Sequence, residues 1–212
     1  MEIVAPLAEH YAEQHSTPLN ELLQKIIAHT EATHPKAHML SGAVQGAFLQ
    51  MISAIVKPLR VLEIGTFTGF SALCLAQGLV KDGLLHTIEL RAEDAAVAQS
   101  FFNESENINK ITLHIGDAKT IIPTLQEQWD LIFIDADKTS YINYYELTLP
   151  FLKTNGIMLV DNVLFHGQVL QENIIGKNAV AIHKFNKHVA DDDRTTQVIL
   201  SVRDGITLIK KL

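Results

Sequence analysis

The stretch VLEIGTFTGFS, residues 61–71, organises the rest of this 212-residue chain. Its first four residues are typical of a short buried strand, Gly65 and Gly69 predict a tight turn, and the apolar positions that follow predict a helix. A strand that enters a helix through a glycine turn exposes backbone N–H groups where a nucleotide can bind. The stretch therefore predicts a nucleotide-binding α/β unit. A glycine turn that serves only strand-to-helix packing is the alternative.

The residues of this turn distinguish between two classes of nucleotide. A dinucleotide fingerprint reads Gly-x-Gly-x-x-Gly, but here Thr66 and Phe70 replace the second and third glycines, and the turn holds no basic residue. These features favour S-adenosylmethionine, which carries no phosphate. The pattern Glu-x-Gly-x-x-x-Gly-x-Ser resembles motif I of the class I methyltransferases. Because a buried carboxylate is costly without a donor, Glu63 is expected to face the pocket and accept a hydrogen bond.

Composition limits the function classes. A hydrophobic content of 47% supports one sizeable core, and the net charge of −7 argues against a large surface that tracks nucleic-acid phosphates. The single cysteine, Cys74, excludes an internal disulfide, and the ten histidines form no zinc-binding spacing. No uninterrupted apolar run approaches membrane-span length. The first residues show no basic n-region and no cleavage signature, so secretion is not expected. A cytoplasmic protein without a membrane partner is expected.

The order of the elements predicts an α/β, Rossmann-like fold in a single domain, residues 1–212. Helices at 3–15, 18–33 and 44–56 form an N-terminal helical layer, residues 1–57, and Thr17 with Pro18 marks the start of the second. In the core, residues 58–212, strands alternate with helices, including a short one at 121–128, and the chain ends in a hairpin. The expected strands are 61–64, 84–90, 111–117, 129–136, 156–161, 196–202 and 206–212. They make a seven-stranded, mostly parallel sheet with one antiparallel strand.

Two strand ends supply further expected contacts to the cofactor. Glu89 stands 24 residues after Gly65, near the spacing of about 20 at which a second-strand carboxylate binds the ribose hydroxyls. An exposed strand-end charge is the alternative. Asp117 ends the third strand and Ala118 follows it. Both are expected to flank the adenine, with Asp117 accepting a hydrogen bond from the adenine amino group.

Oxygen-bearing side chains follow two later strands. Asp135 ends the run at 129–136, and Asp161 with Asn162 ends the next strand. Because α/β sheets bind ligands at their carboxyl edge, these side chains are expected to converge, and two carboxylates would repel unless a cation lay between them. Oxygen-only ligation selects a hard ion, Mg²⁺, Mn²⁺ or Ca²⁺. The alternative is that these residues only form turns.

Three motifs carry a fuller resemblance: Phe-Ile-Asp-Ala-Asp-Lys-x-x-Tyr at 133–141, Val-Asp-Asn-Val-Leu-Phe-x-Gly at 160–167, and Asp-Gly-Ile-Thr-Leu at 204–208. Over about residues 38–212 the chain resembles the cation-dependent O-methyltransferases, the family of catechol and caffeoyl-CoA O-methyltransferases. The resemblance implies a homodimer, and metal ligation by Asp135, Asp161 and Asn162. The expected cofactor-binding residues are Ser41, Glu63, Gly65, Thr66, Ser71, Glu89, Asp117, Ala118, Asp135 and Asp137.

The resemblance also implies a mechanism and an acceptor class. A catechol-type diol chelates the metal, which lowers the phenol pKa from about 10, and Lys138 with a lowered pKa acts as general base. A solvated lysine is the alternative. Residues 165–178 lack an evident arginine and aromatic pair for a coenzyme A tail, so hydroxycinnamates, flavonoids or small catechols are expected. A tRNA hydroxyuridine O-methyltransferase and a non-catalytic cofactor-binding module are the competing functions.

Overall fold

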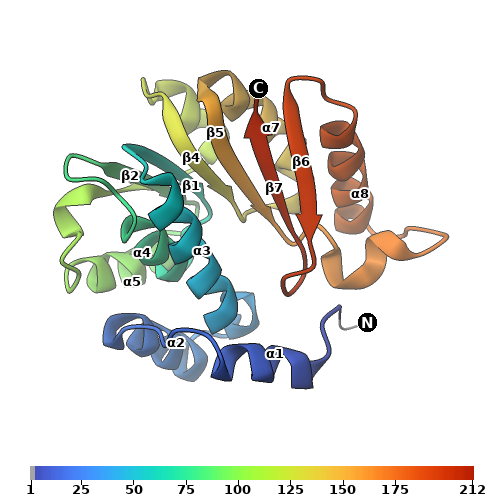
Figure 1. The fold of residues 1–212 in the computed structure, drawn as a ribbon. Helices are drawn as coiled ribbons and strands as arrows, with labels where there is room; N and C mark the ends of the chain where they lie inside the picture. The colour runs from blue at the N-terminus through green and yellow to red at the C-terminus, as the bar shows by residue number, and fades with distance from the viewer. Residues whose placement is uncertain (1–2) are drawn as a thin grey trace.

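The computed structural model describes residues 3–212, with a seven-stranded sheet at its centre (Figure 1). The strand order is β3-β2-β1-β4-β5-β7-β6, and β7 runs antiparallel to the other six strands. The strands are β1 (Arg60–Ile64), β2 (Leu84–Glu89), β3 (Ile111–Ile115), β4 (Trp129–Ile134), β5 (Leu152–Asp161), β6 (Thr195–Leu200) and β7 (Ile206–Lys211). This sheet confirms the predicted fold class, including the single antiparallel strand in the C-terminal hairpin.

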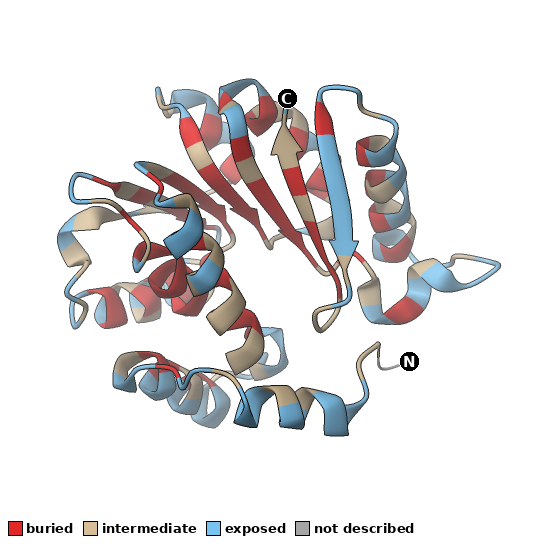
Figure 2. Cartoon of the chain, viewed as in Figure 1, coloured by how far each residue is buried: buried red, intermediate tan, exposed pale blue. Residues whose placement is uncertain are grey.

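Helices cover both faces of the sheet, so each face has its own apolar core. One core packs the sheet against α2 (Glu21–Thr33), α3 (Ala43–Val56), α4 (Phe70–Ala76) and α5 (Ala92–Phe102). The other packs it against α6 (Ala118–Ile121), α7 (Tyr141–Thr148) and α8 (Lys177–Ala190). Figure 2 shows the consequence, since the central strands are largely buried whereas β6 and much of the outer helical surface are exposed. The side chains of Leu62 and Val61 enter opposite cores, as the period of a strand requires.

The N-terminal helices extend beneath the carboxyl edge of the sheet. The first, α1 (Pro6–Gln14), lies near the β6–β7 turn (Figure 1), and none of its described residues is buried. The prediction that the second helix starts at Thr17 and Pro18 is wrong. It begins at Glu21, because the side chain of Asn20 accepts a hydrogen bond from the Leu23 amide at 2.9 Å and caps the first turn.

Two further observations refine the sequence expectations. The short helix predicted at 121–128 lies earlier, at α6, because the Asp117 carboxylate caps the chain directly after β3 and Pro123 belongs to a 3₁₀ turn. Across residues 3–212, one helical stretch, Ala37–Val56, is long and apolar enough to span a membrane by length and composition alone. It contains α3, whose residues Gln45, Gly46, Leu49 and Ser53 are buried inside the protein.

Candidate active site

A cavity of about 810 Å³ opens at the carboxyl ends of the parallel strands. It is the place where α/β sheets bind ligands. Every predicted site residue except Glu63 lines it, so residues far apart in the sequence come together here. The lining includes Ser41, Gly65, Thr66, Ser71, Glu89, Asp117, Ala118, Asp135, Asp137, Lys138, Asp161 and Asn162.

The glycine turn after β1 brings two strand ends unusually close. Gly65 has φ +101°, and a Cβ built on it would lie 1.9 Å from the carbonyl oxygen of Asp135. Only glycine combines that backbone conformation with that approach. The turn therefore sets the end of β1 directly against the end of β4, which joins the predicted cofactor end of the cavity to its acidic end.

Glu63 does not reach the cavity surface, and the expectation that it faces the pocket is wrong. Its carboxylate is fully buried and accepts a hydrogen bond from the Thr87 hydroxyl at 2.5 Å. Thr87 in turn lies 2.5 Å from the hydroxyl of Thr66, which does line the cavity. Burial raises the pKa of Glu63 to about 8, against the lowering effect of the Ser71 and Thr87 hydroxyls. Its other oxygen has no hydrogen-bond partner among the described residues.

Glu89 is oriented by backbone donors at the end of β2. Its carboxylate accepts hydrogen bonds from the amides of Phe67 at 2.7 Å and Arg91 at 3.0 Å, and the residue is buried. The alternative of an exposed strand-end charge is therefore excluded. Asp117 plays a local part as well, since it caps α6 through the Lys119 amide at 2.9 Å while its side chain stays partly exposed.

The acidic end of the cavity comes from β4 and β5. Ile134 and Val160 are register partners, so Asp135 and Asp161, the next residues, stand side by side. Asp161 is 3% exposed and accepts hydrogen bonds from Gln45 Nε2 at 2.7 Å and the Asn162 amide at 2.8 Å. Burial first, and then the charge of Asp135, raise the pKa of Asp161 to about 7. A positive charge at this edge would relieve the repulsion between the carboxylates of Asp135 and Asp161.

Lys138 supplies the positive charge that faces these acids. Its Nζ donates to Asp135 Oδ1 at 2.7 Å and to the Tyr141 hydroxyl at 2.8 Å, and that hydroxyl donates to the backbone oxygen of Asp161 at 3.0 Å. Burial alone would lower the pKa of Lys138, but Asp135, Tyr141 and Asp161 outweigh it and raise the pKa. In this arrangement Lys138 is an ammonium. The lowered pKa was expected for Lys138 beside a bound cation, and that expectation stays a prediction.

The oxygen donors at this end suit a hard divalent cation. Asp135 and Asp161 offer carboxylate oxygens, Asn162 offers an amide oxygen, and all three line one cavity. Asp137 points its carboxylate to local donors instead, since it accepts from the hydroxyls of Thr139 at 2.9 Å and Ser140 at 2.6 Å. Burial alone would raise the pKa of Asp137, but these hydrogen bonds outweigh it and lower the pKa.

Sequence reasoning missed several lining residues. Gln45 is 1% exposed on the inner face of α3, and a polar residue inside the apolar run of that helix was the available signal. Arg203 and Asp204 line the cavity from the β6–β7 turn. Asp204 begins one of the three motifs quoted above, but the sequence assigned neither residue to the site. Phe165 follows Asn162 into the wall, where its amide donates to the Asn162 carbonyl at 3.2 Å.

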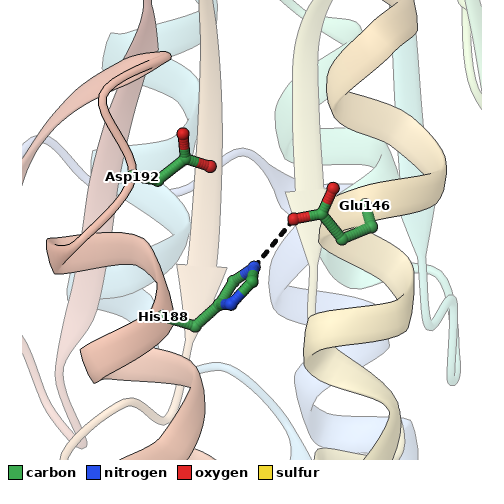
Figure 3. A group of neighbouring side chains, drawn as sticks. All are labelled: Glu146, His188 and Asp192. Atoms are coloured by element: carbon green, nitrogen blue, oxygen red, sulfur yellow. Dashed lines mark hydrogen bonds and ion pairs between the residues drawn. The ribbon is translucent and has the colours of Figure 1, made fainter.

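A second cluster of titratable groups lies between α7, α8 and the start of β6. Figure 3 shows Glu146 and His188 facing one another, with Asp192 beside them. The distance from His188 Nε2 to Glu146 Oε1 is 2.7 Å. Arg194 pairs with Glu146 at 2.7 Å and with Asp192 at 2.6 Å, and its hydrogen bond lowers the pKa of Asp192. The Arg194 guanidinium already balances the negative charges of Glu146 and Asp192. We therefore interpret this cluster as an ion-pair network that links α7, α8 and the start of β6.

Fold and cavity define a ligand-binding α/β protein with paired acids beside its nucleotide-type turn. The family model described as O-methyltransferase matches residues 13–212. A probable caffeoyl-CoA O-methyltransferase of Dictyostelium discoideum is 34% identical over 209 residues, which cover 96% of this chain and 90% of the relative. The chain therefore belongs to the O-methyltransferase family, and it is an enzyme of that class.

Two solved structures match nearly the whole chain. The SAH-bound methyltransferase of Podospora anserina has a TM-score of 0.89 and 28% identity, covering 96% of this chain and 93% of its own. The O-methyltransferase of tomaymycin synthesis from Streptomyces achromogenes, in complex with SAM, has a TM-score of 0.86 and 28% identity, covering 97% and 95%.

Proposed function

We propose that this enzyme transfers a methyl group from S-adenosylmethionine to a hydroxyl of a catechol-type small molecule, with a divalent cation at Asp135, Asp161 and Asn162. One observation carries the proposal. The glycine turn that fits a methyl donor and the paired acids that fit a cation line the same cavity, with Gly65 packed against Asp135. Donor and acceptor would then meet at one sheet edge, and proximity would supply much of the acceleration.

The methyl donor would lie along the ends of β1, β2 and β3. Glu89 has its carboxylate held by two backbone amides, and its remaining lone pairs suit the two ribose hydroxyls. Ala118 and Asp117 line the wall beyond it, on the adenine side. The SAH and SAM that the two solved relatives contain support this choice of donor.

The cation, Mg²⁺ or else Mn²⁺ or Ca²⁺, would lower the pKa of a bound phenol and orient it. Lys138 is the candidate catalytic residue, because its Nζ donates to the Asp135 carboxylate and the residue lines the cavity. Asp135 and Asp161 are the groups that raise the pKa of Lys138, and they are also the proposed ligands. Ligation of these carboxylates would weaken their hold on the lysine proton and favour its role as general base.

A flat, apolar acceptor fits the wall near Asn162. Phe165 lies beside Asn162, and Met39 and Leu40 line the same cavity. A ring between such side chains would present two adjacent hydroxyls to the acidic end. Hydroxycinnamates, flavonoids and small catechols meet this description, and the caffeoyl group in the name of the Dictyostelium relative carries the same diol.

The tRNA alternative has no observation in its favour. Within residues 3–212, the cavity is lined by seven carboxylates and only three Lys or Arg side chains, Arg91, Lys138 and Arg203. A phosphate backbone would meet net repulsion there. We further infer that the enzyme works in the cytoplasm as a homodimer, with the exposed apolar residues Leu7, Tyr11, Met51 and Ile55 of α1 and α3 as the candidate contact surface.

The acceptor class is tested by incubating the enzyme with methyl-labelled S-adenosylmethionine and Mg²⁺. Parallel reactions contain a catechol panel, matched monophenols, or total transfer RNA. Label on the catechols, and not on the monophenols, supports the proposal. Label on transfer RNA alone would replace it with the RNA-modifying function. Light scattering of the same sample reports whether the protein is a dimer.

A further inference from the structure

A loop and a turn from distant parts of the chain are fastened together at the acidic end of the cavity. The loop, residues 162–167, begins with Asn162, and the turn contains Asp204. The Asp204 carboxylate uses both oxygens, since Oδ2 accepts from Asn162 Nδ2 at 3.4 Å and Oδ1 accepts from the His166 amide at 2.5 Å. Its side chain is 13% exposed, so water competes little for these contacts.

Backbone hydrogen bonds also link the loop at 162–167 to the turn that contains Asp204. The amide of Leu164 donates to the Asp204 carbonyl at 2.9 Å, and that of Val163 donates to Gly205 at 3.1 Å. Asn162 has φ +57°, and two further non-glycine residues of the loop also adopt positive φ. Such backbone persists only where the surroundings hold it in place. The turn is therefore the support that fixes where the loop, and the side chain of Asn162, can lie.

The chemistry of an amide makes this contact directional. A side-chain amide has a donor NH₂ on one side and an acceptor oxygen on the other, so the partner of Nδ2 determines where Oδ1 points. A carboxylate can only accept, which ties Nδ2 of Asn162 to Asp204. The opposite side of the amide, its oxygen, is then available to the cavity that Asn162 lines.

We propose that Asp204 is a positioning residue that keeps the amide oxygen of Asn162 turned toward the cation. This inference rests on the proposed cation site. An asparagine at position 204 would offer one acceptor and one donor where two donors now arrive. The side-chain amide of Asn162 could then rotate, so that its oxygen accepts a hydrogen bond from the new NH₂ at position 204. That rotation would turn the NH₂ of Asn162, in place of its oxygen, into the cavity.

The test measures Mn²⁺ affinity directly, from the paramagnetic resonance signal of free Mn²⁺, together with SAH affinity by calorimetry. Partners that orient metal ligands typically contribute about 10- to 100-fold in metal affinity, so Asp204→Asn should weaken Mn²⁺ binding by about that factor while SAH binding stays within about twofold. Asp193→Asn makes the same chemical change at an exposed position outside the cavity and should leave both affinities unchanged.

A second background separates positioning from general damage. In an Asn162→Asp variant the ligand is a symmetric carboxylate that needs no orientation and repels Asp204. There, Asp204→Asn should leave Mn²⁺ affinity unchanged or improve it, because the new amide can donate to the new carboxylate. A loss in both backgrounds, or in neither, would overturn the positioning role. If the unchanged enzyme binds no Mn²⁺, the cation site itself fails and this proposal fails with it.

Discussion

Gln45 donates a hydrogen bond of 2.7 Å to Asp161 although 116 residues separate them in the sequence. The contact runs from the first turn of α3 to the end of β5, so it ties the N-terminal helices to the acidic end of the cavity. Both residues are almost completely buried. The helical layer that precedes the first strand therefore contributes a side chain that contacts the acidic end of the cavity.

Replacing Gln45 by Leu should destabilise the protein by about 1–3 kcal/mol, because a buried carboxylate oxygen loses its donor. The matched control is Gln50→Leu on the same helix, whose amide makes only a 3.8 Å contact with the sulfur of Cys74. That change should cost less than about 1 kcal/mol. Urea unfolding at pH 7 with a chelator present measures the free energy of unfolding of both variants. Equal decreases would show that the hydrogen bond from Gln45 to Asp161 contributes no more to stability than the Gln50 contact does.

The buried carboxyls of Glu63 and Asp161 should contribute a loss of stability as the pH rises from about 4.5 to about 8. Burial raises the pKa of Glu63 from 4.5 to about 8, so in this window the unfolded chain has lost the proton that the folded protein retains. Unfolding then releases a proton, and the free energy of unfolding decreases with increasing pH. Asp161 adds a change of the same sign up to about pH 7.

The Glu63→Gln variant isolates this contribution. It keeps an acceptor for the Thr87 hydroxyl but has no proton to release, so its stability should depend less steeply on pH. Urea midpoints at pH 5, 6, 7 and 8, with chelator, give the two slopes. Parallel slopes for the variant and the unchanged protein would assign the pH dependence to other groups.

Replacing Lys138 by Met should lower turnover by about 10²- to 10⁴-fold, the usual contribution of a general base, and leave SAH affinity unchanged. The reason is the position of its Nζ, 2.7 Å from Asp135 and beside the proposed acceptor site. Lys187→Met, at an exposed position of α8 outside the cavity, serves as the control. A fully active Lys138→Met enzyme would reject the catalytic role of this lysine.

Gly65 and Gly176 provide a matched pair for the cost of close packing. Both have positive φ, but a Cβ at Gly65 would lie 1.9 Å from the Asp135 carbonyl, whereas one at Gly176 would meet nothing within 4 Å. Gly176→Ala should therefore cost only the backbone strain, about 1–3 kcal/mol. The Gly65→Ala variant has a backbone clash in addition, so it should be less stable still and should bind SAH more weakly. Equal thermal shifts for the two variants would contradict this reading.

The seven-stranded sheet, and the proximity of Asp135 to Asp161, could be predicted because both follow from local sequence patterns. Apolar runs locate β1 and β4, and the end of each parallel strand falls at one edge, which brings Asp135 beside Asp161. The hydrogen bond expected for the buried Glu63 is confirmed, but its place beneath the cavity surface was not predictable, since the sequence does not reveal that Thr87 donates to it from the neighbouring strand. Nor did the sequence show that Asp135, Tyr141 and Asp161 surround Lys138 and raise its pKa. Contacts between distant segments, such as Asn162 with Asp204, leave no local signal.

The central claim is that methyl transfer depends on a divalent cation held at the ends of β4 and β5. The most direct measurement is the rate of methylation of a catechol by the chelator-treated enzyme, followed by its rate as Mg²⁺ is restored. The account predicts negligible transfer after chelation and saturable recovery with Mg²⁺, with little recovery when Asp161 is replaced by Asn. Full activity in the chelator-treated enzyme, with no response to added Mg²⁺, would contradict it.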